Sequence, residues 1–334
     1  MKLTLDIALG AHWLSHAENN DELKALAFLT SRAQRALHAM PLEAYVCQNI
    51  GLREAPDFPI APMAAQADGL ALENHIWLRA DPVHFVLQRD AFSLHDEVPI
   101  ALDIAEAQVF IAHLNQHFSG DGLHFSLGNS GHWYVHFAQN SVDFYPVRTS
   151  LPQLAAGKSV QHFLPQGQAA KKWRSVLNEV QMLLHDHPVN LALENAKKIV
   201  VNSLWLSGGG VLPSAFSRAL DKPTMMVADN PFYAGLANLL AVDFLNVPNS
   251  TAFLSEQKNH HLRLALSGAQ AFEKNAAWIS SILDLLKKRK IRALILNVGF
   301  YDQTLTATIS PLDLLKIWRQ PKPLFAFFEQ KTSA

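Results

Sequence analysis

Residues 178–210, NEVQMLLHDHPVNLALENAKKIVVNSLWLSGGG, combine several groups that could do chemistry. His185 and His187 flank an aspartate, and a neutral imidazole can bind a metal or move a proton near pH 7. The glycines Gly208, Gly209 and Gly210 could aim backbone N–H groups at an anion. The stretch is therefore either part of an active site or the framework of a site that has lost its chemistry.

The expected helix over residues 171–187, which ends before Pro188, separates the two histidines. Positions 173, 176, 177, 180, 183, 184 and 187 form one stripe, apolar except for His187. Asn178, Gln181 and His185 line up on one flank. We expect His187 to pack in the core and bond to a carbonyl, and the flank to face a possible cleft. A purely structural role for both histidines is the alternative. Residues i and i+2 do not face each other on a helix, so the spacing alone makes no metal site.

The glycines follow an expected strand over residues 198–206 and precede an expected helix over 213–220. We expect Ser207 to Gly210 to form a tight turn. Such a turn could bind an anion together with the next helix N-terminus, or it could simply pack against its neighbours. The pattern matches neither a P-loop nor GxGxxG, and Pro213 removes one donor. Asn190 and Asn202 complete the polar groups that could line a cleft with the helix flank.

Other candidates are weaker. Asp81 with His84 and Asp121 with His124 have the spacing of a carboxylate–histidine pair, but such pairs arise by chance in a chain with 16 histidines. Ser203 lacks the G-x-S-x-G context of a hydrolase nucleophile. His260 and His261 are expected to be exposed. No metal site is predicted from these residues.

Composition excludes several classes of protein. The net charge of −1 predicts no nucleic-acid or membrane partner. The single cysteine, Cys47, excludes an intrachain disulfide. No signal peptide and no transmembrane helix are expected, which favours a cytoplasmic protein.

The order of elements predicts two parts. Strand-like and helix-like segments over residues 77–137 indicate a small α+β unit, with a helix over 101–118 capped by Asp103 and Glu106 and a hairpin over 120–137. A strand over 3–9, a helix over 21–39, and alternating helices and apolar strands from residue 171 onward indicate an α/β fold around a largely parallel sheet. The later segments are expected strands over 223–228, 244–248 and 291–299 and expected helices over 230–241 and 275–290.

Several segments together resemble the RpfE-type regulatory proteins: WLRADPVH, IAEAQVFIAHLN, HWYVHF, NEVQMLLHDHPVN, NSLWLSGGG and SPLDLLKIWRQPKPL. More distantly, the chain resembles the archaeal-type cofactor-independent phosphoglycerate mutases of the alkaline-phosphatase-like superfamily. This second resemblance rests on His187-Pro188-Val189-Asn190 followed by the segment from Asn202 to Gly208. It implies a core of residues 1–74 and 151–334 with a largely parallel sheet, and an inserted α+β cap domain of residues 75–150.

The departures from the mutase pattern bear on function. Those enzymes use two metal ions and a serine nucleophile, with ligands from an N-terminal Asp-Gly and a late Asp-x-x-Gly-His segment. Here LTLDIALGAHWL has Asp6 but no Asp-Gly, and the late segment is missing. The resemblance therefore implies a degenerate mutase-like protein with no catalytic residue, metal or cofactor.

Such a protein would bind a small anionic metabolite or a regulatory protein partner in a cleft between core and cap. The expected cleft residues are Asn178, Gln181, His185, Asn190, Asn202, Gly208, Gly209 and Gly210. The alternative is a metal-dependent, mutase-like phosphotransferase or phosphohydrolase with a rearranged site that recruits histidines such as His185 or His84.

Overall fold

The fold is known from a computed structural model, which describes residues 1–10, 13, 20–89, 91–96, 98–155, 157–214, 222–257, 261–272 and 277–328. The chain divides into two compact units, Met1–Gly51 with Ser217–Ala334, and Leu52–Phe216. The second unit is thus inserted in the sequence of the first. The predicted cap, residues 75–150, lies within the second unit, which also includes 52–74 and 151–216.

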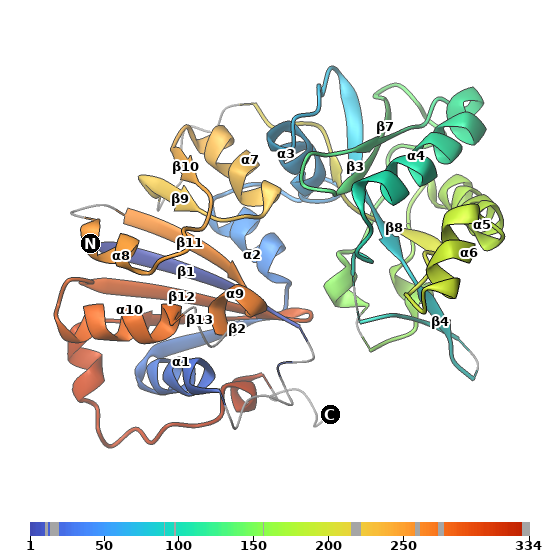
Figure 1. The fold of residues 1–334 in the computed structure, drawn as a ribbon. Coiled ribbons are helices and arrows are strands. Elements are labelled where there is room, and N and C mark those ends of the chain that lie inside the picture. The colour runs from blue at the N-terminus through green and yellow to red at the C-terminus, as the bar shows by residue number, and fades with distance from the viewer. Residues whose placement is uncertain are drawn as a thin grey trace. The chain divides into compact units, whose positions relative to one another are not determined.

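The first unit is built on a seven-stranded sheet of order β10-β9-β11-β1-β12-β13-β2 (Figure 1). The strands from β10 to β12 are parallel, and β13 and β2 are antiparallel, so the predicted α/β class with a largely parallel sheet is confirmed. The strands are β1 (Lys2–Leu9), β2 (Gln34–His38), β9 (Met225–Val227), β10 (Asp243–Leu245), β11 (His261–Ser267), β12 (Ala293–Phe300) and β13 (Gln303–Ile309).

The helices of the first unit cover both faces of this sheet. Those α-helices are α1 (Asp21–Arg32), α2 (Leu42–Asn49), α7 (Pro231–Leu240), α8 (Ala252–Glu256), α9 (Gly268–Phe272) and α10 (Trp278–Lys287), followed by 3₁₀ turns η5 (Pro311–Leu315) and η6 (Leu324–Phe327). The helix predicted over 21–39 is too long. It ends at Arg32, and residues 34–38 instead pair with β13 as an edge strand. The helix predicted over 213–220 lies mostly outside the described residues.

The second unit is built on a four-stranded sheet of order β6-β7-β3-β8, in which every pair is antiparallel. Its elements are α3 (Ile60–Ala67), β3 (His75–Val83), β4 (Phe85–Leu87), β5 (Phe92–Leu94), α4 (Ile104–Phe118), β6 (His124–Leu127), β7 (Trp133–Ala138), α5 (Ala170–His185), α6 (Pro188–Asn195) and β8 (Ser203–Gly210), with short 3₁₀ turns η2 (Ser119–Asp121), η3 (Pro152–Leu154) and η4 (Val160–Phe163).

Two local predictions hold in the second unit. The capping box of α4 is present, because Asp103 accepts from the Glu106 N–H and Glu106 accepts from the Asp103 N–H. The hairpin is the antiparallel pair β6–β7. Because β8 pairs with β3, the segment from α5 to β8 belongs to the same unit as the hairpin.

Candidate functional site

The seven-stranded sheet of the first unit has one apolar face and one polar face. Side chains alternate along β1, so Leu3, Leu5 and Ile7 enter the core formed with α1 and α10. Thr4 and Asp6 point to the opposite face, and both are buried. The chain therefore places polar groups in the middle of a covered sheet, where each needs a partner.

Asp6 finds two partners on the neighbouring strands. Its Oδ2 accepts from Arg263 Nε on β11 at 2.7 Å, and its Oδ1 accepts from Asn297 Nδ2 on β12 at 2.7 Å. The three residues are at most 4% exposed. Burial alone lowers the pKa of Arg263, but the Asp6 carboxylate and neighbouring tyrosines hold that pKa above its usual value, so the guanidinium stays charged.

This network leaves hydrogen-bonding capacity unused within the described part of the chain. Arg263 Nη2 and Asn297 Oδ1 are buried without a hydrogen-bond partner there. The guanidinium also lies 6.0 Å from the centre of the Tyr233 ring on α7. An unpaired buried donor on a charged group is costly, so the Nη2 of Arg263 calls for an explanation.

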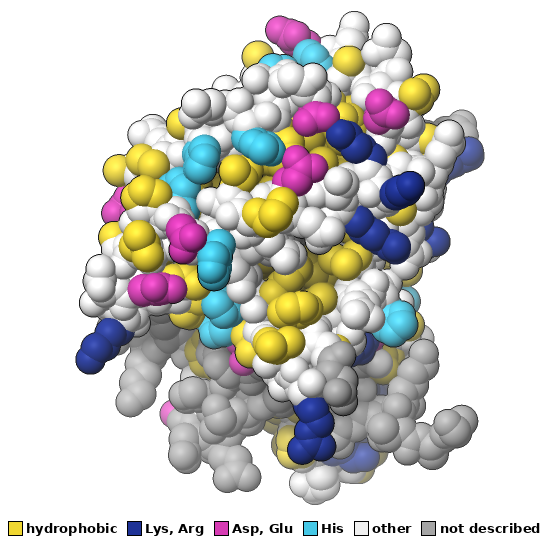
Figure 2. All heavy atoms as spheres, turned by 90° about the vertical axis from the view of Figure 1, so that its right-hand side faces the viewer, with side chains coloured by type: hydrophobic (Ala, Val, Ile, Leu, Met, Phe, Trp, Pro, Cys, Tyr) yellow, Lys and Arg dark blue, Asp and Glu magenta, His cyan; other side chains and the backbone are white. Residues whose placement is uncertain are grey.

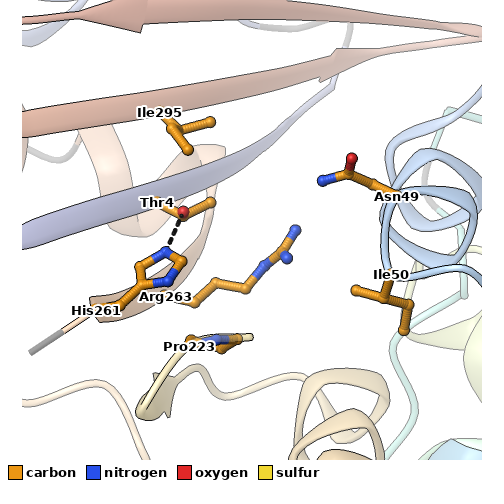
Figure 3. Close-up of a pocket in the computed structure, with 7 residues that line it drawn as sticks. All are labelled: Thr4, Asn49, Ile50, Pro223, His261, Arg263 and Ile295. Carbon is orange, nitrogen blue, oxygen red and sulfur yellow. Dashed lines mark hydrogen bonds between the residues drawn. The ribbon is translucent and has the colours of Figure 1, made fainter. Parts of the chain in front are cut away.

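A small pocket opens beside Arg263 in the first unit (Figure 3). Its seven lining residues are Thr4, Asn49, Ile50, Pro223, His261, Arg263 and Ile295. Thr4 Oγ1 and His261 Nε2 lie 2.9 Å apart, and the Asn49 side chain lies across the pocket from the guanidinium. His261 is half-buried, so the prediction that it is exposed is wrong, while His260 lies outside the described residues. These groups can hold a small polar molecule.

The predicted cleft residues of α5 lie on its surface. Asn178, Gln181 and His185 are all exposed and share one flank, as the helical spacing predicts. The side chain of His185 is 83% exposed and lies 4.0 Å from the equally exposed Asp186. Their part in ligand binding stays a prediction.

His187 is buried, as predicted, but its partner differs. It caps α6, and its Nδ1 accepts from the Val189 N–H at 3.3 Å, so the expected bond to a carbonyl is wrong. Its ring stacks on Phe110 with centroids 4.4 Å apart. Burial, followed by the nearby His113, lowers the pKa of His187, which favours the neutral acceptor form.

Asn190 and Asn202 bond to the backbone in different places. Asn190 is buried, donates to the carbonyls of Leu184 and Val201, and accepts from the Val201 N–H. Asn202 exchanges two hydrogen bonds with the backbone of Phe85. Each amide thereby ties a loop to a neighbouring element.

The three glycines form a bulged end of β8, so the predicted tight turn is wrong. Pairing runs from Trp77 opposite Gly210 to Arg79 opposite Ser207, which leaves an extra residue on β8. Gly208 has φ of +65°, and a Cβ there would lie 2.9 Å from Ile60 Cβ on α3. Only glycine permits this combination of backbone conformation and close packing.

The bulge is held by a buried carboxylate. Asp57 accepts from the Gly209 N–H at 3.4 Å, from the Thr149 N–H at 3.0 Å and from the Thr149 hydroxyl. Burial raises the pKa of Asp57 to about 6, against the opposing effect of these hydrogen bonds.

A serine, a histidine and an aspartate meet at the β6–β7 hairpin. Ser130 Oγ lies 2.6 Å from Asp68 Oδ2 and 2.7 Å from His132 Nδ1. Asp68 also accepts from the Ser130 N–H at 2.6 Å and from Tyr134 Oη at 3.0 Å. The aspartate binds the serine and does not orient the histidine, unlike a catalytic triad. The arrangement fixes the hairpin to the end of α3.

The carboxylate–histidine pairs suggested by spacing have other partners. Asp121 accepts from Lys172 at 2.7 Å, and His124 stacks on His136. His84 Nδ1 lies 2.9 Å from the Val200 carbonyl oxygen. Among the residues that the structure describes, no group of three or more His, Cys, Asp or Glu side chains is placed to hold a metal ion.

Histidines of the second unit gather along one face of its sheet. The ring of His136 stacks on Trp77 at 4.3 Å and lies 5.3 Å from His124 and 5.0 Å from His75. Burial, followed by the two neighbouring histidines, lowers the pKa of His136 to about 4. Figure 2 shows histidine side chains at the surface, interspersed with acidic groups on the left of that view.

Comparisons with known proteins point to one group of enzymes. No protein-family model matches the chain. The chain is 24% identical over 213 residues to the 2,3-bisphosphoglycerate-independent phosphoglycerate mutase of Methanosarcina mazei, covering 62% of this chain and 51% of that protein. The Methanosarcina acetivorans mutase is 24% identical over 200 residues, covering 58% and 48%. The chain thus spans about half the length of these curated relatives.

Two solved structures are also distantly similar to the chain. A cofactor-independent phosphoglycerate mutase from Thermoplasma acidophilum has a TM-score of 0.41 at 14% identity, covering 93% of this chain and 90% of that one. A Pyrococcus horikoshii protein has a TM-score of 0.48 at 13% identity, covering 92% and 87%. The chain is distantly similar to cofactor-independent phosphoglycerate mutases.

The two-metal centre that the resemblance implies does not fit the residues present at β1. Both carboxylate oxygens of Asp6 are taken by Arg263 and Asn297, and the carboxylate is fully buried. Leu9, a buried apolar residue, precedes Gly10 at the carboxyl end of the strand. A guanidinium therefore supplies the positive charge beside Asp6.

Spacing rules did not find Arg263, Asn297 and Asn49. A signal exists nonetheless: LTLDIAL, HLRLALS and LILNVGF each place one charged or amide side chain in the middle of a largely apolar strand. Burying such a polar side chain costs free energy unless the register of the strands brings it next to a hydrogen-bond partner. Here the register places Arg263 and Asn297 close enough to bond to Asp6. A search for polar residues inside buried strands would have found all but Asn49, which is on α2.

Proposed function

We propose that this chain is a phosphoglycerate-mutase-like protein that acts by binding a ligand and does not carry out two-metal phosphoryl transfer. The observation that carries the proposal is the Asp6–Arg263–Asn297 network, which uses both oxygens of the acidic residue in β1. A buried ion pair holds the strands in a fixed arrangement, and the pocket beside it offers polar groups to a ligand.

The biological setting is part of the same proposal. The segments that resemble RpfE-type proteins suggest a regulatory role in the cytoplasm, through a small anionic metabolite or a protein partner. The exposed flank of α5, with Asn178, Gln181 and His185, is available for such a partner. No helix among the described residues is long and apolar enough to cross a bilayer.

Metal analysis of untagged protein tests the proposal. Mass spectrometry of the purified chain is expected to find no stoichiometric divalent ion. Protein incubated with Mn²⁺, Zn²⁺ or Mg²⁺ is expected to interconvert phosphoglycerates no faster than a buffer control. About two ions per chain, together with turnover that scales with protein and disappears with a chelator, would overturn the proposal.

The second candidate is a metal-dependent, mutase-like phosphotransferase with a rearranged site. The sequence similarity to curated mutases favours it. It would need new ligands such as His84 or His185. In the structure His84 lies beside a carbonyl oxygen and His185 is exposed at the end of α5. Among the described residues, neither belongs to a group of three or more side chains that could hold a metal ion. The assays above decide between the two candidates.

A further inference from the structure

We propose that the pocket beside Arg263 binds the carboxylate group of a small organic acid. This inference names a ligand class for the binding role proposed above and rests on it. The pocket lies near the beginnings of β1, β11 and β12, at the third residue of each strand. Ligands of open α/β sheets usually bind at the opposite, carboxyl ends, so this is a separate place on the fold.

Arg263 supplies the recognition chemistry. Its Nε is committed to Asp6 at 2.7 Å, whereas its Nη2 is buried without a hydrogen-bond partner in the described chain. In Figure 3 the guanidinium lies in the middle of the pocket, between Thr4 and Asn49. The planar fork of a guanidinium matches the two oxygens of a carboxylate.

The remaining walls select a short ligand with an apolar end. The Thr4 hydroxyl with His261, and the Asn49 amide, provide further polar groups, while Ile50, Pro223 and Ile295 provide apolar contacts. The cavity has a volume of about 20 Å³. On the same scale, a single water molecule needs roughly 10–15 Å³. This room suits the two oxygens of a carboxylate better than a tetrahedral phosphate.

The charges nearby also favour a singly charged anion. Asp6 already balances the charge of Arg263, so a dianion would meet one carboxylate and one guanidinium. We expect weak binding of a monocarboxylate, with a dissociation constant on the order of 1 mM.

A titration followed by ¹⁵N TROSY spectra of the full chain tests the site. Propionate is added at constant ionic strength, with chloride as the control salt. The backbone amide signals of Thr4, Arg263 and Ile295 are expected to shift and saturate. Asn49→Asp places a negative charge at the rim and should weaken binding about tenfold or more. Gln48→Glu makes the same charge change on the neighbouring exposed residue outside the pocket, and should change binding less than about twofold.

Titrations with other ligands identify the source of the carboxylate. N-acetylglycine represents a peptide C-terminus, and tighter binding than propionate would identify a peptide end as the ligand. Inorganic phosphate that binds more tightly than both acids would overturn the assignment to a carboxylate. Absence of saturable shifts, or equal effects of Asn49→Asp and Gln48→Glu, would overturn the site.

The two proposals can fail separately. Metal-dependent mutase turnover would overturn the binding role without changing the propionate titration. If the protein contains no metal, shows no turnover and does not bind propionate, the proposed binding role stands and the assignment of a carboxylate ligand is overturned.

Discussion

The two units of this protein bury carboxylates in different ways. In the first unit, Asp6 is neutralised by Arg263 from the adjacent parallel strand. In the second unit, Asp57 accepts from backbone N–H groups and a threonine hydroxyl, which are supplied by a loop and the bulged end of β8.

The difference has a physical consequence. A guanidinium at 2.7 Å offsets much of the cost of burying the Asp6 carboxylate inside the sheet. Neutral hydrogen-bond donors offset the cost of burying a carboxylate less well than a guanidinium does. Burial therefore raises the pKa of Asp57 to about 6 in spite of its hydrogen bonds. The first arrangement fixes strands and keeps a cation available beside a pocket, whereas the second makes the fold of a loop depend on pH.

The largest effect is expected from breaking the ion pair. Asp6→Asn leaves the Arg263 charge buried without its counter-charge, which should lower the free energy of unfolding by about 3–5 kcal/mol. Urea denaturation measures the loss. The double variant Asp6→Leu with Arg263→Met removes both charges and should recover most of the stability. Equal stability of Asp6→Asn and the wild type would show that this pair does not hold the first unit.

The second effect is the pH dependence that Asp57 gives to the second unit. Its folded pKa is raised from 3.8 to about 6, so the stability it contributes is present below pH 3.8 and is lost as the pH rises through 6. Compared with Asp57→Asn, the wild type should lose about 2 kcal/mol of unfolding free energy between pH 3.8 and 6. Urea unfolding across this range tests it, and parallel pH profiles for the two proteins would contradict it.

The bulge that Asp57 holds gives a third test. Gly208→Ala adds a Cβ at φ +65°, at 2.9 Å from Ile60 Cβ, and should cost about 2–3 kcal/mol in unfolding free energy. Gly131→Ala is the matched control, because Gly131 has φ +88° with no atom within 4 Å of its Cβ position. It should cost only about 1 kcal/mol, from backbone conformation alone. Similar melting temperatures for the two variants would argue against close packing at Gly208.

The smallest effect is expected from His136, because its side chain is only partly buried and solvent screens its charge. Its pH dependence runs in the direction opposite to that of Asp57. Its pKa is lowered from 6.5 to about 4, so the stability it contributes is present above pH 6.5 and is lost as the pH falls through 4. His136→Phe keeps the stacking on Trp77 and should reduce the loss of stability on the acid side. Thermal unfolding at pH 4 and pH 7 measures this, with exposed His185→Phe as the control. An unchanged acid-side loss in His136→Phe would contradict the assignment.

Much of the fold could be predicted from local patterns. Asp103 with Glu106 predicted the start of α4, and the glycine-rich turn between apolar alternations predicted the β6–β7 hairpin. The alternation of helices with apolar strands predicted the parallel sheet, although the strand expected over 198–206 is part of β8 in the antiparallel sheet. These features depend on backbone hydrogen bonds and burial within a few residues, which the sequence specifies directly. By contrast, the end of α1 at Arg32 was missed, because residues 34–38 become a strand only through pairing with β13.

The candidate site shows the limit of the sequence alone. The sequence determined that a charged or amide side chain interrupts each of β1, β11 and β12, and that the glycines near residue 208 have a special backbone. Only the tertiary structure decided that Asp6, Arg263 and Asn297 meet, because they are up to 291 positions apart and their contact depends on strand order and register. It likewise decided that Gly208 packs against Ile60, since the bulge of β8 exists only in pairing with β3.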